Sequence, residues 1–260
     1  GVSNGLAAVG TGQEQYGVIG TIQTGGNVIN QASPQINNPT ITLAARRVGD
    51  AAATANVSIS NVATVAPQAA LNASIAANGA PVMASGSFNL LTPGATNNSN
   101  LAVGISTATA GNFTGVNAGK ATVSLVSDAS NVGGCAPNCQ LNLAPQTVNV
   151  EGKVYTAAQG TVQGAVNFGI VHVNDVVASQ GVSVQNTAPA TALNDTLKAT
   201  ISGAGGAFSN NGGTAGGLIA GGAANNSALM IGLNTTTAGI FSGNAVVGLA
   251  SQNPDMADLN

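Results

Sequence analysis

Two cysteines, Cys135 and Cys139, form the motif CAPNC and carry the clearest covalent chemistry in this chain. Their close spacing within a stretch of Gly, Pro and Asn favours a disulfide that closes a small turn. A metal site would need further ligands, and the single histidine, His172, is far away in the sequence. We therefore predict a disulfide between these cysteines, which is typical of proteins in an oxidising compartment.

The other ionisable residues form no pattern that indicates catalysis. His172 lies among alternating apolar residues and is predicted to face solvent on a strand, without a partner for acid–base chemistry. Asp50 and Asp175 precede equivalent strands and are expected to cap turns. Asp255 and Asp258 lack the repeated ligand spacing of an EF-hand. We predict no catalytic residue, no cofactor and no metal site, and we expect the protein not to be an enzyme.

Charge is scarce, which excludes several kinds of partner. The 260 residues include five basic and eight acidic side chains, with a net charge of −3, and 44% are hydrophobic. Beyond Arg46-Arg47 there is no basic cluster, so nucleic-acid binding is not expected. No apolar run is long enough for a membrane-spanning helix. The neutral composition, rich in Asn, Thr and Gly, is common in secreted bacterial surface proteins. Because the chain begins with Gly1, we interpret it as a mature secreted chain; the alternative is a piece of a longer one.

The sequence contains two copies of one unit. Their segments occur in the same order, with spacings that differ by only a few residues at Gly-rich turns. The matching pairs are NVSISN (56–61) with GVSVQN (181–186), LNASI (71–75) with LKATI (197–201), NNSNLAVGISTATAGNFTG (97–115) with NNSALMIGLNTTTAGIFSG (225–243), and GKATVSL (119–125) with GNAVVGL (243–249).

Each matched segment alternates apolar and small polar residues, the pattern of a half-buried strand. Short strands separated by turn residues predict an all-β fold of two tandem immunoglobulin-like antiparallel β-sandwiches. We place an N-terminal leader with a candidate donor strand in residues 1–26, the first sandwich in 27–157, and the second, incomplete sandwich in 158–260.

The second copy resembles the bacterial choice-of-anchor D family of extracellular β-sandwich repeats. The resemblance rests on VNFGIVHVNDVVASQGVSVQNTA (166–188), on the repeated NNS segment and on PQTVNVEGKVY (145–155). The first copy departs at its opening, where NNPTITLAARRVGD (37–50) replaces the NFG phrase. The resemblance implies immunoglobulin-like folds in secreted or cell-surface proteins, and it implies no catalytic residues.

The second copy is predicted to lack its final strand. In the first copy, LNLAPQTVNVEGKVY (141–155) has the pattern of a closing strand. In the second, SQNPDMADLN (251–260) follows the corresponding strand, and its last two residues repeat only the opening Leu-Asn. The strand left without a neighbour would expose an acceptor edge containing Ala245, Val247 and Leu249.

The N-terminal segment of the chain contains a strand pattern that matches the closing strand missing from the second copy. QYGVIGTIQTGG (15–26) aligns with TVNVEGKVYTAA (147–158), with Val18 on Val150 and Ile22 on Val154. We predict a donor strand over residues 16–24, with Tyr16, Val18, Ile19 and Ile22 as its apolar residues.

These patterns lead to a hypothesis of a secreted structural subunit whose partners are copies of itself. The donor strand of one molecule would complete the second sandwich of the next, and the head-to-tail contact would propagate into an extracellular filament, as in a biofilm matrix. In two alternatives, the missing strand comes from the neighbouring repeats of a longer array or from the N-terminal segment of the same molecule. The rival function is a monomeric cell-surface adhesin or binding repeat with glycan or matrix contacts.

Overall fold

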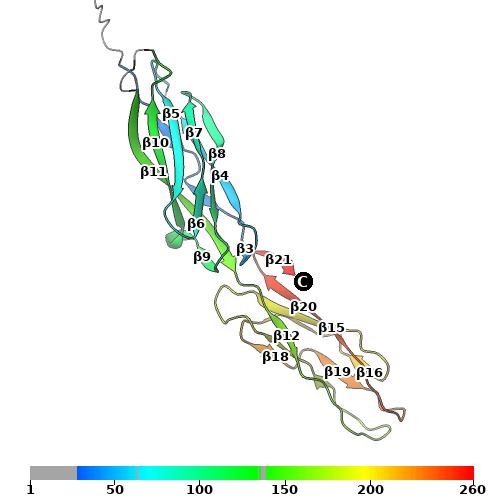
Figure 1. Cartoon of the computed structure of the whole chain (residues 1–260). Helices are drawn as coiled ribbons and strands as arrows, with labels where there is room; N and C mark the ends of the chain where they lie inside the picture. The colour runs from blue at the N-terminus through cyan, green and yellow to red at the C-terminus, as the bar shows by residue number, and fades with distance from the viewer. Residues whose placement is uncertain (1–27, 63, 134, 136–138) are drawn as a thin grey trace, which may run out of the picture.

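The computed structural model describes residues 28–62, 64–133, 135 and 139–260. It contains two β-sandwiches placed end to end in an elongated molecule, and strand β11 runs from the first into the second (Figure 1). The described part contains no α-helix, and the pairing of its neighbouring strands is almost entirely antiparallel. The all-β class predicted from the sequence is therefore confirmed.

The first sandwich has two sheets, with strand orders β1-β4-β8-β6 and β2-β11-β10-β5-β7. Strands β3 and β9 also pair with β11. The bounds are β1 (Pro34–Ile36), β2 (Thr40–Thr42), β3 (Arg46–Arg47), β4 (Thr54–Asn61), β5 (Ala70–Ala77), β6 (Val82–Ser85), β7 (Ser87–Leu91), β8 (Thr96–Ile105), β9 (Gly111–Phe113), the short 3-10 helix η2 (Gly115–Asn117), β10 (Gly119–Asp128) and β11 (Gln140–Tyr155).

The second sandwich has three smaller sheets, with orders β12-β14-β18, β13-β19-β16 and β17-β15-β20-β21. The bounds are β12 (Gly160–Gln163), β13 (Gln180–Gly181), β14 (Ser183–Asn186), β15 (Thr196–Ser202), β16 (Phe208–Asn210), β17 (Thr214–Ile219), β18 (Ala224–Asn225), β19 (Met230–Leu233), β20 (Val246–Asn253) and β21 (Met256–Leu259).

Each sandwich has its own hydrophobic core, built from the alternating residues of its strands. In β4, Val57 and Ile59 are buried, whereas Ser58 and Ser60 are only partly covered. Alternation places every second side chain on the inner face, so a period-two sequence closes a core between two sheets. The large aromatic residues are few, and small branched residues fill most of both cores.

A buried asparagine fixes the same corner in both sandwiches. Asn61 accepts a hydrogen bond from the backbone N–H of Ser33 (3.0 Å) and donates to the carbonyl of Ala69 (3.2 Å). Asn186 accepts from the N–H of Gln159 (3.0 Å) and donates to the carbonyl of Asp195 (3.3 Å). Because a buried amide without such partners would be costly, this conserved bonding between the copies supports the predicted internal repeat.

The two aspartates cap equivalent turns, as predicted. Asp50 accepts a hydrogen bond from the N–H of Arg47, and Asp175 accepts one from the N–H of His172, both at 2.8 Å. His172 therefore occupies the place of Arg47. It lies exposed at the start of this turn, not on the strand that its alternating neighbours predicted, because the turn ends the alternation. The equivalence also assigns the opening of the first copy: residues 40–50 correspond to 165–175.

Candidate functional site

Strand β11 closes the first sandwich along its whole length. It pairs with β10 from Asp128↔Gln140 to Gly119↔Val150, and β2, β3 and β9 pair with its later residues. Val148, Val150 and Val154 point into the core and are buried. This one strand therefore supplies a row of core side chains and satisfies the backbone of several neighbours.

Strand β20 of the second sandwich corresponds to β10, and it pairs with β15 in the register in which β10 pairs with β5. In the first sandwich Ser127 pairs with Leu71 and Leu125 with Ala73. In the second, Ser251 pairs with Leu197 and Leu249 with Ala199. The two pairs of strands are therefore equivalent residue by residue, which places Ala245, Val247 and Leu249 on Ala121, Val123 and Leu125.

Strand β21 corresponds only to the beginning of β11. Ser127 pairs with Leu141, and the equivalent Ser251 pairs with Leu259. The Leu-Asn echo seen in the sequence thus has the register of a closing strand. Beyond it, the outer edge of β20 from residue 246 to 250 has no strand paired to it among the described residues.

The predicted acceptor residues lose cover at this open edge. Ala121, Val123 and Leu125 are buried in the first sandwich, whereas their counterparts Ala245, Val247 and Leu249 are only half-buried. Since the residue types are nearly the same in both copies, the difference reflects the unpaired edge of β20 among the described residues and not a more polar second core.

Two adjoining hollows lie on this side of the second sandwich, and only the first contacts β20. One has a volume of about 510 Å³ and contacts Ala245 and Val247, and the other has a volume of about 470 Å³. Both are lined by Val166, Phe168, Phe208 and Phe241, so they form one groove, which we call the open groove. The rings of Phe168 and Phe208 stack within it, with centroids 6.3 Å apart.

The segments that flank β11 in the first sandwich have unpaired counterparts around the open groove. Strand β2 pairs in parallel with β11, but its counterpart, residues 165–167, is not a strand. Strand β9 also pairs with β11, and its counterpart contains the exposed residues Ile240 and Phe241. Ile170, next to the groove, is likewise exposed. Several apolar side chains around the open groove are therefore exposed, and the segments that flank it have no strand partner there among the described residues.

The predicted donor residues Tyr16, Val18, Ile19 and Ile22 lie outside the described residues. The first described residue, Val28, has 86% of its surface exposed.

A second site, the joint between the sandwiches, was not found by sequence reasoning. The Arg47 side chain crosses from the first sandwich and donates from Nε to Asp195 Oδ2 of the second at 2.6 Å. Asp195 also accepts from Ser251 Oγ (2.8 Å) and Asn253 Nδ2 (2.6 Å). The Arg47 and Asp195 side chains are 10% and 0% exposed, so this is a buried ion pair with its remaining acceptor sites satisfied.

A more exposed cluster lies beside this pair. Asp255 accepts hydrogen bonds from Lys153 Nζ (2.8 Å) and from the Tyr155 hydroxyl (2.5 Å), both at the end of β11. These two bonds lower the pKa of Asp255. Burial, followed by the hydrogen bond to the Asp255 carboxylate, raises the pKa of Tyr155. The cluster ties the end of β11 to the turn before β21.

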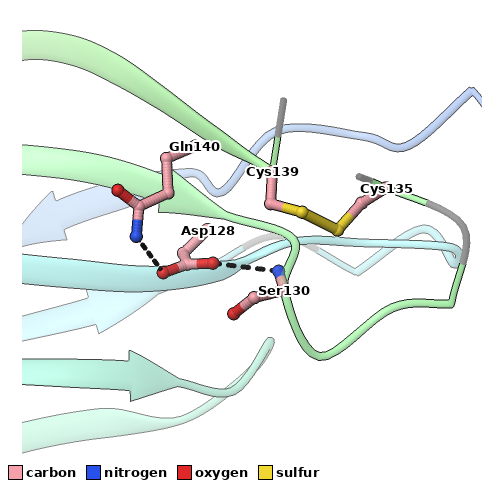
Figure 2. The surroundings of a disulfide bond; sticks show 5 residues. All are labelled: Asp128, Ser130, Cys135, Cys139 and Gln140. Atoms are coloured by element: carbon pink, nitrogen blue, oxygen red, sulfur yellow. Dashed lines mark hydrogen bonds between the residues drawn. A yellow bond between two sulfur atoms is a disulfide. The ribbon is translucent and has the colours of Figure 1, made fainter. Parts of the chain in front are cut away.

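The cysteines lie at the opposite end of the first sandwich. Cys135 and Cys139 are joined by a disulfide in the connection between β10 and β11, close to the buried Asp128 (Figure 2). Asp128 accepts from the Ser130 N–H (2.9 Å) and from Gln140 Nε2 (2.8 Å). The bonds from Ser130 are the main reason that the pKa of Asp128 falls to about 2.

Within the described ranges, no three His, Cys, Asp or Glu side chains gather in a way that could hold a metal ion. Asp255 and Asp258 instead face Lys153 and Lys198. No helix in the described part of the chain is both long and apolar enough to cross a membrane.

Comparison with known proteins gives little. No family model matches the chain, and no curated protein matches it. A solved structure of a chimeric titin Z1Z2 functionalized with a KLER peptide from decorin is similar over 87% of this chain and 92% of its own, with 14% identity. Its TM-score of 0.24 is too low to support an argument about fold or function.

Proposed function

We propose that the protein is a secreted structural subunit that polymerises head-to-tail into an extracellular filament by donor-strand complementation. The observation that carries the proposal is the open groove, which Ala245 and Val247 line, beside the unpaired edge of β20. These two residues and Leu249 are half-buried, whereas their counterparts in the first sandwich are fully buried. A strand that enters such a groove gains backbone hydrogen bonds for affinity and side-chain pockets for specificity. The chemistry required of the occupant is an extended segment with alternate apolar residues.

The proposed occupant is the head of a second copy of this chain, within residues 1–27. Its residues 16–24 contain the alternation that the groove requires. Each buried apolar side chain of the occupant would contribute about 1.5–3 kcal/mol, in addition to the strand hydrogen bonds. Because donor and acceptor lie on different parts of the molecule, the contact does not close on itself and propagates into fibres.

The geometry opposes closure by the same molecule. Asn30 pairs with Gln68 beside the start of β5, at the end of the first sandwich away from the joint. Strand β11 has 16 residues between these two ends, which corresponds to about 50 Å at roughly 3.3 Å per residue. The segment from Thr24 to Asn30 spans at most about 22 Å when fully extended. A strand at residues 16–24 therefore cannot reach the open groove of its own chain.

The extracellular location and the absence of catalysis belong to the same proposal. A disulfide between Cys135 and Cys139 is compatible with an oxidising compartment. The low charge and the resemblance to choice-of-anchor D repeats favour a secreted or cell-surface protein. A filament subunit needs stable sandwiches and a specific joint, and it needs no catalytic residue or cofactor.

The test compares the full chain with a variant that lacks residues 1–26, by electron microscopy and size-exclusion chromatography. The full chain is expected to form fibres, and the variant to remain monomeric with an intact first sandwich, because the core of that sandwich begins at Ala32. A synthetic peptide of residues 13–29 should bind the variant and raise its melting temperature. Fibres formed by the variant would refute donation by the head. A full chain that stays monomeric under all conditions, with no peptide binding, would favour a surface-binding repeat.

A further inference from the structure

The residues at the start of each sandwich make equivalent backbone hydrogen bonds. In the first, Asn30 N–H donates to Pro67 O and Ala69 N–H donates to Asn30 O, both at 2.9 Å. In the second, Thr156 N–H donates to Leu193 O (2.8 Å) and Asp195 N–H donates to Thr156 O (2.9 Å). The next bond is also repeated, since Ser127 Oγ accepts from Ala32 N–H and Ser251 Oγ from Ala158 N–H. Asn30 is therefore the structural counterpart of Thr156.

This equivalence fixes an alignment of the segments that come before. Counting back from Asn30 and Thr156 without a gap places GTIQTGGNVINQA (20–32) on QTVNVEGKVYTAA (146–158). Thr21 then matches Thr147, Gly26 matches Gly152, and Val28 matches Val154, while Ile22 falls on Val148. Before Thr156 the chain is β11, the closing strand of the preceding sandwich.

From this we infer that residues 20–29 of one molecule occupy, in the open groove of the next, the place that residues 146–155 occupy in the first sandwich. The inference rests on the proposed function and specifies its partner segment and register. Ile22 pairs with Ala245, as Val148 pairs with Ala121, and Thr24 pairs with Gly243, as Val150 pairs with Gly119. The chain then passes directly into the next sandwich through Asn30, as β11 passes into the second through Thr156.

Two residues of the segment, Ile22 and Gly26, suit their places. Ile22 replaces the buried Val148 and points toward the half-buried row of Ala245 and Val247. Gly26 replaces Gly152, where a Cβ atom would lie only 3.0 Å from Ile105 Cδ1. A larger residue would fit this place poorly, because packed interiors tolerate little extra volume.

Val28 gives independent support. Its counterpart Val154 is buried in the first sandwich, whereas Val28 is 86% exposed in the isolated chain. An exposed valine two residues before the backbone bonds of Asn30 has the position expected of a residue that a neighbouring sandwich would cover.

This register differs from the one given by sequence similarity, which places Val18 on Val150 and Gly20 on Gly152. Both alignments put a glycine at the place of Gly152 and both point Ile22 inward, so composition does not choose between them. The register from sequence similarity would insert extra residues between the donor strand and Asn30. The structure shows no such spacer between β11 and Thr156.

Cysteine crosslinking in the full chain distinguishes the two registers. Thr122 pairs with Thr147, and its counterpart Val246 is exposed at the outer edge of β20. Directly opposite residues on antiparallel strands are close enough for a disulfide. The test variant is Thr21→Cys/Val246→Cys, and the matched control is Gln15→Cys/Val246→Cys, which the register from sequence similarity would place opposite each other.

After mild oxidation, the test variant should give a ladder of covalent multimers on a non-reducing gel, and the control should remain monomeric. A ladder from the control alone would overturn this register and leave the proposed function standing. Fibres without a ladder from either variant would also overturn the register. A crosslinked monomer from the test variant would indicate closure within one molecule and overturn both, and the absence of both fibres and ladders would overturn the proposed function itself.

Discussion

Removal of the Arg47 side chain should destabilise the second sandwich, although Arg47 belongs to the first. In Arg47→Ala, Asp195 stays buried without its cation, and the loss of one partner from a buried pair typically costs about 3–5 kcal/mol. Asp195 keeps its bonds from Ser251 and Asn253, so we expect the lower part of that range, about 3 kcal/mol. That value corresponds to a roughly 100-fold shift in the opening equilibrium of the second sandwich.

Hydrogen exchange measured peptide by peptide can locate this effect. Protection should fall in β15 and β20, which contact Asp195, and should change little in β5 and β10 of the first sandwich. The matched control is Arg46→Ala, because the Arg46 side chain bonds to the carbonyls of Ala45 and Ala51 of its own sandwich. The double variant Arg47→Ala/Asp195→Ala should recover much of the loss, since no buried charge then remains unpaired.

The result that would refute this reasoning is an Arg47→Ala protein whose β15 and β20 are as protected as those of Arg46→Ala. The ion pair would then contribute nothing at the joint, and the end-to-end arrangement would depend on β11 and on the bonds from Lys153 and Tyr155 to Asp255. A loss of protection that is equal in both sandwiches would also contradict it, because Asp195 belongs only to the second.

Three further predictions concern titration and the disulfide. The pKa of about 2 at Asp128, below its usual 3.8, means that its stabilisation is complete above about pH 4 and is lost as the pH falls toward 2; urea unfolding should show a loss of about 2 kcal/mol there, absent in Asp128→Asn. The raised pKa of Tyr155 means that its stabilisation is present below about pH 10 and is lost at higher pH. Ultraviolet titration in a Tyr16→Phe background should detect this shift, and Asp255→Asn should reduce it. Replacement of Cys135 and Cys139 by Ala should cost at most about 2 kcal/mol in thermal unfolding, because the closed loop is short.

The repeat and the incomplete closing strand were predictable because they depend on local patterns. Alternating residues specify which face of a strand is buried, and the echo of Leu141-Asn142 in Leu259-Asn260 corresponds to equal pairing with Ser127 and Ser251. A period-two pattern also excludes a shift of the register by one residue, since such a shift would turn the apolar side chains outward. These features need no knowledge of distant contacts.

The joint was not predictable from the same patterns. Arg47 and Asp195 are far apart in sequence, and nothing local to either residue indicates its partner. Their counterparts in the other copy are His172 and Ala69, which cannot form an ion pair with each other. Comparison of the two copies therefore does not indicate the pair either. The prediction that His172 lies on a strand was wrong for a related reason. The hydrogen bond from its N–H to Asp175 forms a turn that ends the alternation, and the apolar pattern alone does not indicate that bond.

The comparison of the two copies also shows how the two kinds of joint in the proposed filament would differ. Strand β11 both closes the first sandwich and leads into the second, so closing and linking are performed by one element. If residues 20–29 act in the same way between molecules, the filament continues the tandem repeat across a noncovalent break. At that break, however, His172 and Ala69 stand in the places of Arg47 and Asp195. The proposed joint between molecules would therefore lack the buried ion pair of the joint within each molecule and would depend on the inserted strand, so bending should concentrate at every second joint.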